Sequence, residues 1–188
     1  MKLKFLSVAL LFGITAIVQS QVPRIEFSFD TDWKFFRGDI TGAEKTKFND
    51  KAWRSLDLPH DWSVEDIPEQ EPGKVIGPFY KESPGTTSTG YVLGGTGWYR
   101  KTFSLSASSR EMQTFINFDG VYMDCDVWIN GKHAGSQPYG YIAFNLNIST
   151  FLNTPGQPNV IAVRVRNEGK THDGTADRVS TGVFSLYL

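Results

Sequence analysis

Apolar and polar residues alternate along four segments of this chain. In the segment 124–129, Cys125, Val127 and Ile129 fall on one face, and two of the three residues on the other face are aspartates. An apolar face opposite a polar, solvent-facing one, repeating every two residues, is typical of antiparallel strands. No stretch after residue 20 keeps a helical period for more than two turns. The pattern therefore predicts an all-β chain with strands in the segments 113–118, 124–129, 142–148 and 161–165.

Turn-forming residues separate these segments. Asn130-Gly131 directly follows the segment 124–129 and is a strong short signal for a β-hairpin. Pro-Gly-Gln-Pro at 155–158 separates two later strands. Short strands joined in this way predict a β-sandwich of antiparallel strands with Greek-key or jelly-roll connections. The segment 63–96, rich in Pro, Gly, Glu and Ser, is long for a connection, so we expect it to form the loop on the binding side.

The first twenty residues predict a signal peptide. Lys2 and Lys4 precede an apolar run from Phe5 to Val18, and Ser20 is a small residue suited to cleavage. A membrane anchor is the alternative, but the run is shorter than the ~18–20 apolar residues that span a bilayer. We therefore expect residues 1–20 to be removed and residues 21–188 to form one domain, periplasmic or secreted and free of the membrane.

Composition excludes some functions and favours others. The 19 basic and 20 acidic residues give a net charge of −1, which becomes −3 without Lys2 and Lys4, so the chain has no basic stripe for nucleic acid. A single cysteine rules out an internal disulfide. Aromatic residues make up 14% of the chain, and there are 18 glycines. Flat side chains on a turn-rich β scaffold suit sugar recognition, although most of these rings are expected in the core.

Three groups of reactive residues have a plain structural interpretation beside a chemical one. His60-Asp61 could belong to a catalytic arrangement, but Pro59 and Asp61 better suit an edge strand that enters a turn, where Asp61 bonds backbone amides two residues on. Asp124 and Asp126 share a strand face and could bind a metal or act as glycosidase carboxylates, yet no third ligand stands nearby. We expect these two to be ordinary residues of a solvent face, and Cys125 a buried side chain.

Seven short motifs follow one another along the chain. They are DWKF at 32–35, WRSLDLPHDW at 53–62, GTGWYRKTF at 95–103, FDGVY at 118–122, VWING at 127–131, PYGY at 138–141 and NVIAVRV at 159–165. In this order and spacing, from about residue 25 to about residue 167, the chain resembles the N-terminal sugar-binding domain of glycoside hydrolase family 2, β-galactosidase branch.

The resemblance implies a jelly-roll, galactose-binding-like sandwich and a carbohydrate partner, a galactoside-like glycan. It also implies that the loop 94–97 leans toward the sugar pocket of a catalytic barrel, which is the second expected partner. The glycines of this loop match neither a P-loop nor a dinucleotide-binding motif, so no cofactor is expected. The carbohydrate-binding candidates are Asp61, Trp62, Gly95, Trp98, Tyr139, Asp177 and Arg178.

Family members cleave β-galactosides with two glutamates on an α/β barrel, which needs on the order of 250 residues. We therefore assign no catalytic residue and no metal ligand in this chain, and do not expect it to be catalytic alone. The tail 168–188 departs from the family pattern, which suggests a fragment, a frameshifted product or a truncated gene. The alternatives are a free-standing carbohydrate-binding module, or a folded domain that associates through an exposed interface.

Overall fold

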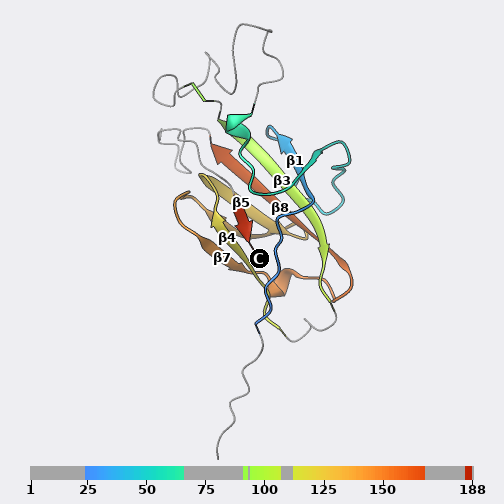
Figure 1. Cartoon of the computed structure of the whole chain (residues 1–188). Coiled ribbons are helices and arrows are strands. Elements are labelled where there is room, and N and C mark those ends of the chain that lie inside the picture. Colours follow the sequence, from blue (N-terminus) through green and yellow to red (C-terminus); the bar gives the residue numbers. More distant parts are fainter. Residues whose placement is uncertain (1–23, 66–90, 93, 107–111, 168–184, 188) are drawn as a thin grey trace, which may run out of the picture.

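The computed structural model describes residues 24–65, 91–92, 94–106, 112–167 and 185–187. Residues 1–23, including the expected signal peptide, lie outside the described residues, as do Asp177 and Arg178. Two antiparallel sheets face each other (Figure 1). The larger has six strands in the order β2-β1-β3-β8-β5-β6, and the smaller has three in the order β7-β4-β9. The predicted all-β sandwich of antiparallel strands is confirmed.

The strands are short except for the two at the centre of the larger sheet. Those two are β3 (Gly95–Ser104) and β8 (Pro158–Asn167), which pair along their whole length. The other strands are β1 (Trp33–Arg37), β2 (Arg54–Leu56), β4 (Phe115–Gly120), β5 (Asp124–Ile129), β6 (Lys132–Gln137), β7 (Phe144–Asn147) and β9 (Ser185–Tyr187). Two 3₁₀ turns, η1 (Trp62–Val64) and η4 (Ser149–Phe151), complete the described elements. No helix among the described residues is long and apolar enough to span a membrane.

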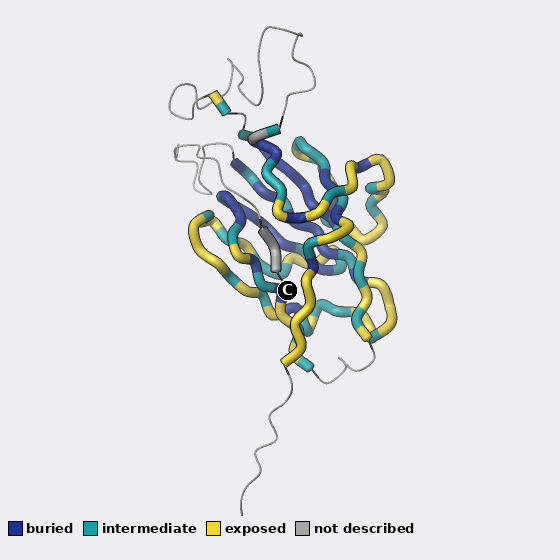
Figure 2. The backbone as a smooth tube through the Cα atoms, in the orientation of Figure 1, coloured by how far each residue is buried: buried dark blue, intermediate teal, exposed yellow. Residues whose placement is uncertain are grey.

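The main core lies between the two sheets. Val127, Val163 and Tyr99 point from the larger sheet toward Ile116 and Phe118 of β4, and all five are buried. Figure 2 shows this as continuous burial along the central strands. The inward faces predicted for β4, β5 and β8 are thus confirmed, because alternation placed their apolar residues on one side.

The outer face of the larger sheet carries a second, smaller core. Trp98 and Ala162 pack there against Ala43 and Trp53 of the segment that joins β1 to β2. Arg100, also on this face, donates from Nε to Asp50 Oδ2 at 2.9 Å and from Nη1 to the Ala43 carbonyl. This buried arginine fastens the covering segment, so β3 is enclosed on both faces.

The structure confirms the predicted hairpin but differs from the predicted strands in two details. The hairpin at Asn130-Gly131 is confirmed, with positive φ angles of 53° and 77° at its two residues, as a type I′ turn requires. Ile142, however, precedes β7 and is exposed, so the strand begins at Phe144. The prediction that the outer face of β5 is exposed to solvent is also wrong, because Asp124 and Asp126 are only 4% and 7% exposed.

Candidate functional site

Several chain segments meet at one end of the larger sheet, here called the loop end. The strand register places Gly95 opposite Asn167, Asp124 opposite Arg166, and Cys125 opposite Gln137, so β3 and β5 begin where β8 and β6 finish. The 3₁₀ turn η1 lies at the same end (Figure 1). Of the predicted binding segment 63–96, residues 63–65, 91–92 and 94–96 are described.

The turn that carries Trp62, residues 61–65, is fixed by hydrogen bonds within the turn. Asp61 accepts a hydrogen bond from the Ser63 amide at 2.8 Å, and the Glu65 amide donates to the Trp62 carbonyl at 3.4 Å. This confirms the structural role predicted for Asp61. Edge strand β2 ends a few residues earlier, and the Leu58-Pro59 peptide is cis.

Trp62 packs directly over Gly97 of β3. A side chain at Gly97 would begin 2.9 Å from the Trp62 ring and 3.0 Å from the Phe35 ring, so only glycine leaves room for both. Trp62 also stacks on Phe35 with ring centroids 5.8 Å apart. The glycines of the 94–97 segment therefore do allow a close approach, but at Gly97 the surface that approaches is the chain's own tryptophan.

A polar network surrounds His60 beside this turn. The ring lies 2.8 Å from the Tyr99 hydroxyl through Nδ1 and 2.9 Å from Glu65 Oε1 through Nε2. Arg54 Nη2, from edge strand β2, lies 2.6 Å from the same Nε2 and 2.5 Å from Glu65 Oε1. Burial lowers the pKa of His60, against the opposing influence of Glu65. Tyr99 is fully buried, so this network does not present an exposed nucleophile.

Two exposed tyrosine rings lie at the loop end. Tyr139 and Tyr141 are 54% and 67% exposed, and their ring centroids are 5.6 Å apart. Tyr141 also meets the edge of buried Tyr122 at 5.2 Å, which ties the segment after β6 to the segment before β5. Gly140 makes this contact possible, because a side chain there would begin 2.4 Å from the Tyr122 ring. Two of the three rings thus offer apolar surface at fixed positions.

The structure separates the predicted binding residues into three groups. Asp61, Trp62, Gly95 and Tyr139 lie at the loop end. Apart from its chain neighbours, no described residue places an atom within 4 Å of the point where a side chain at Gly95 would begin. Trp98 lies on the outer face of the sheet, where it is 2% exposed, stacks on Trp128 at 5.4 Å and donates to Asp39 at 3.3 Å. Trp98 therefore packs the second core. Asp177 and Arg178 lie outside the described residues, so their predicted role stays a prediction.

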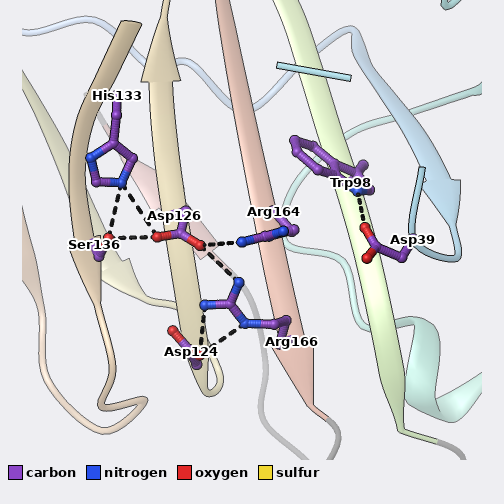
Figure 3. Close-up of polar contacts among 8 residues, drawn as sticks. All are labelled: Asp39, Trp98, Asp124, Asp126, His133, Ser136, Arg164 and Arg166. Atoms are coloured by element: carbon purple, nitrogen blue, oxygen red, sulfur yellow. Dashed lines mark hydrogen bonds and ion pairs between the residues drawn. The ribbon is translucent and has the colours of Figure 1, made fainter. Parts of the chain in front are cut away.

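Four charged residues cross-link β5 and β8 on the outer face (Figure 3). Arg166 Nε donates to Asp124 at 2.9 Å, and its Nη1 donates to Asp126 at 2.8 Å. Arg164 Nη2 also donates to Asp126, at 2.8 Å. From β6, the Ser136 hydroxyl donates to Asp126 at 2.5 Å, and His133 Nε2 lies 3.3 Å from the same oxygen. We call Asp124, Asp126, Arg164 and Arg166 the outer-face charge cluster.

Donors surround the Asp126 carboxylate of the outer-face charge cluster. Burial alone would raise the pKa of Asp126, but hydrogen bonds from Ser136 and Arg164 and the charge of Arg166 hold it well below its usual range. The carboxylate is thus an anion whose positions are already taken by donors. No group of three or more potential metal ligands occurs among the described residues. The cluster joins strands, and the alternative of a metal site or a pair of glycosidase carboxylates finds no support in its geometry.

An all-β sandwich with exposed aromatic rings at a loop end fits a carbohydrate-recognition domain, and comparison with known proteins shows the family. Residues 54–176 match the family model described as "Glycosyl hydrolases family 2, sugar binding domain". The chain belongs to this family.

Two relatives illustrate the likeness. The chain is 44% identical over 145 residues to the Beta-galactosidase BoGH2A of Bacteroides ovatus, a match that covers 77% of the chain and 16% of that enzyme. It is 43% identical over 151 residues to a Putative beta-glucuronidase of Formosa agariphila, covering 80% of the chain and 13% of that protein. The chain therefore spans about a seventh of the length of the curated relatives it matches.

Solved structures show the same relationship. A glycosyl hydrolase family 2 member from Bacteroides cellulosilyticus superposes with a TM-score of 0.72 at 40% identity, over 86% of this chain and 20% of that one. A Bacteroides uniformis beta-glucuronidase superposes with a TM-score of 0.61 at 30% identity, over 77% of this chain and 15% of that one.

Proposed function

We propose that the chain is the sugar-binding part of a family 2 glycosidase that acts on β-galactosides, and that it holds the glycan at the loop end. The observation that carries this proposal is the pair of exposed tyrosines, Tyr139 and Tyr141, held 5.6 Å apart by the contact with Tyr122. An aromatic face packs well on the apolar C–H face of a pyranose, and exposed apolar patches on a folded domain usually mark a binding site.

The choice of galactosides rests on one relative and on the binding surface. The relative at 44% identity is named a Beta-galactosidase, whereas the one at 43% is named a Putative beta-glucuronidase. Uncharged tyrosine faces suit a neutral sugar, while a glucuronide carries a carboxylate that is usually met by an arginine. We therefore propose a neutral, galactose-containing ligand.

Calorimetric titration of the 188-residue chain with lactose tests this function. Saturable binding is expected, with methyl β-glucuronide binding more weakly. Tyr139→Ala and Tyr141→Ala are each expected to lower lactose affinity about tenfold or more, since removing a stacked ring costs roughly 1–1.5 kcal/mol or more. Phe115→Ala is the matched control, because Phe115 is a 42% exposed ring at the opposite end of β4 from the loop end.

Two outcomes of this titration would contradict the proposal. Absence of saturable heat with lactose would refute glycan binding by this chain. Tighter binding of the glucuronide would refute the galactoside class while retaining the sugar-binding role.

We further propose that the chain works with a catalytic domain, because the match covers only 16% and 13% of the two relatives. No catalysis is expected from the chain alone. Co-expression with the remaining part of the Bacteroides ovatus relative is expected to restore cleavage of a chromogenic galactoside, whereas each part alone stays inactive. Hydrolysis by the chain alone would contradict this division of labour.

Export is a separate proposal that rests on residues 1–20. A chain produced in a Gram-negative host is expected to reach the periplasm with Gln21 as its new N-terminus. Mass spectrometry of the periplasmic fraction measures this directly. Recovery only in the cytoplasm with Met1 or Lys2 as the first residue would contradict it.

A further inference from the structure

The hydrogen-bonding capacities around His60 separate two states of its ring. His60 Nε2 lies 2.6 Å from Arg54 Nη2, which only donates, and 2.9 Å from Glu65 Oε1, which only accepts, so it can serve one of them at a time. In the neutral ring Nε2 accepts from Arg54. The ring proton then lies on Nδ1, where it donates to the Tyr99 hydroxyl at 2.8 Å. Arg54 Nη2 has two hydrogens and donates the other to Glu65 Oε1 at 2.5 Å. With a neutral His60, one nitrogen of Arg54 thus joins strand β2 to His60, which directly precedes the Trp62 turn, and to Glu65, which ends it.

Protonation of His60 is incompatible with this arrangement. A hydrogen on Nε2 would face the guanidinium at 2.6 Å and bring two cations into contact. Glu65 Oε1, at 2.9 Å from Nε2, is the nearest acceptor for that hydrogen. His60 and Arg54 therefore compete for the same carboxylate oxygen, and only one of them can hold it without facing the other.

The surroundings of His60 determine which partner yields. The His60 side chain is 10% exposed and rests against the Phe35 ring of β1 at 4.6 Å, while the Arg54 side chain is 50% exposed. The charged and titratable groups that face the ring are Glu65 and Asp61 from the turn, Arg54 from β2 and Tyr99 from β3, and Arg37 of β1 acts on Glu65. The exposed arginine can leave toward water at little cost, and the enclosed histidine cannot.

We propose that His60 is a pH-dependent positioning residue, which on protonation takes Glu65 from Arg54 and so releases the Trp62 turn from strand β2. The turn bears Asp61 and Trp62, two of the candidate binding residues, and the Trp62 Nε1 atom is buried without an acceptor among the described residues. A change in the attachment of the turn therefore changes the position of this buried donor and of the turn around it. This consequence for glycan binding rests on the proposed function, but the exchange at Glu65 does not.

Nuclear magnetic resonance of the 188-residue chain between pH 8 and pH 4.5 tests the exchange. The His60 ring, the Arg54 side-chain N–H and the Trp62 indole N–H are followed together, with the indole assigned through Trp62→Phe. All three signals are expected to change with one common midpoint below 6.5, the ordinary histidine value. An Arg54 or Trp62 signal that stays constant while His60 titrates would overturn the proposal.

Two variants and a control separate this role from simple packing. His60→Gln, which cannot titrate, is expected to abolish the inflection of Arg54 and Trp62. His133→Gln, at the exposed histidine on β6, is the matched control and is expected to retain it. Arg54→Gln is expected to raise the midpoint of His60, because it removes a neighbouring cation, and this arm decides the question by itself if His60→Gln does not fold. An inflection that persists in His60→Gln, or a midpoint that does not rise in Arg54→Gln, would contradict the proposal.

Lactose affinity, measured across the same pH range, distinguishes this proposal from the proposed function. Affinity that falls through the His60 midpoint supports both. If the three resonances respond together but lactose never binds, the exchange at Glu65 stands and the proposed function fails.

Discussion

Asp126 on β5 and Arg164 on β8 face each other across the larger sheet, and Arg164 Nη2 donates to Asp126 Oδ2 at 2.8 Å. Arg166 Nη1 reaches the same oxygen at 2.8 Å, and Ser136 of β6 donates to the other carboxylate oxygen. A single carboxylate on the outer face thus connects three adjacent strands, β8, β5 and β6.

Replacing Asp126 is expected to destabilise the fold. Asp126→Ala leaves Arg164 and Arg166 without this shared partner, and we expect a loss of about 2 kcal/mol in the free energy of unfolding, between the values for exposed and for buried ion pairs. Urea denaturation measures it. Asp119→Ala, at an exposed position of β4, is the control and is expected to change stability by less than about 0.5 kcal/mol. Equal effects of the two substitutions would contradict the importance of the cluster.

The same carboxylate makes stability sensitive to acid. The folded pKa of Asp126 lies well below the ordinary aspartate value of 3.8, so on acidification the unfolded chain takes up the proton first. Its contribution is therefore complete above about pH 3.8 and is lost as the pH falls below that value. The difference in unfolding free energy between the wild type and Asp126→Asn is expected to narrow from pH 7 to pH 3. A difference that grows on acidification would show that the sign is wrong.

Gly97 is expected to tolerate no side chain. In Gly97→Ala the new methyl group would meet the Trp62 and Phe35 rings at 2.9 Å and 3.0 Å, so we expect a loss of about 1–3 kcal/mol and a shifted Trp62 indole resonance. Gly120→Ala is the matched control, since its nearest contact, the Gly140 carbonyl, lies 3.9 Å away. Thermal unfolding compares the two, and a Gly97→Ala protein as stable as Gly120→Ala would contradict the packing described.

Cys125 is expected to be unreactive in the folded chain. Burial raises the pKa of its thiol to about 12, so almost no thiolate is present at pH 8. A thiol-specific reagent should label the native chain slowly and the urea-unfolded chain at once. Fast labelling of the native chain would show that β5 opens or that Cys125 is accessible.

The sequence was a good guide to the strands in which apolar and polar residues alternate. β5 and the segment of β8 from Ile161 to Val165 alternate cleanly, and the structure has both. β3 was recognised only as part of the family pattern, because Trp98 and Arg100 are buried on one face and Tyr99 on the other. Residues such as Arg100 look like surface residues until the segment that covers them is known.

The site shows the same limit. Alternation placed Asp124 and Asp126 correctly on one face, but their partners follow about forty residues later. The signal that could have revealed the cluster is the pairing of Asp-Cys-Asp at 124–126 with Arg-Val-Arg at 164–166 on two strands of opposite direction. Trp98 was grouped with Trp62 by the family pattern, although its position in β3 points it to the other face. The register of β3 against β1 decides this, and sequence alone does not supply it.

Chemical-shift mapping with lactose on the isotope-labelled chain decides whether the loop end binds glycans. The account predicts saturable shifts at Tyr139, Tyr141 and the Trp62 indole, with Phe115 and the outer-face charge cluster unchanged. Shifts confined to the outer face or to the Phe115 end, or no saturable shifts at all, would contradict it.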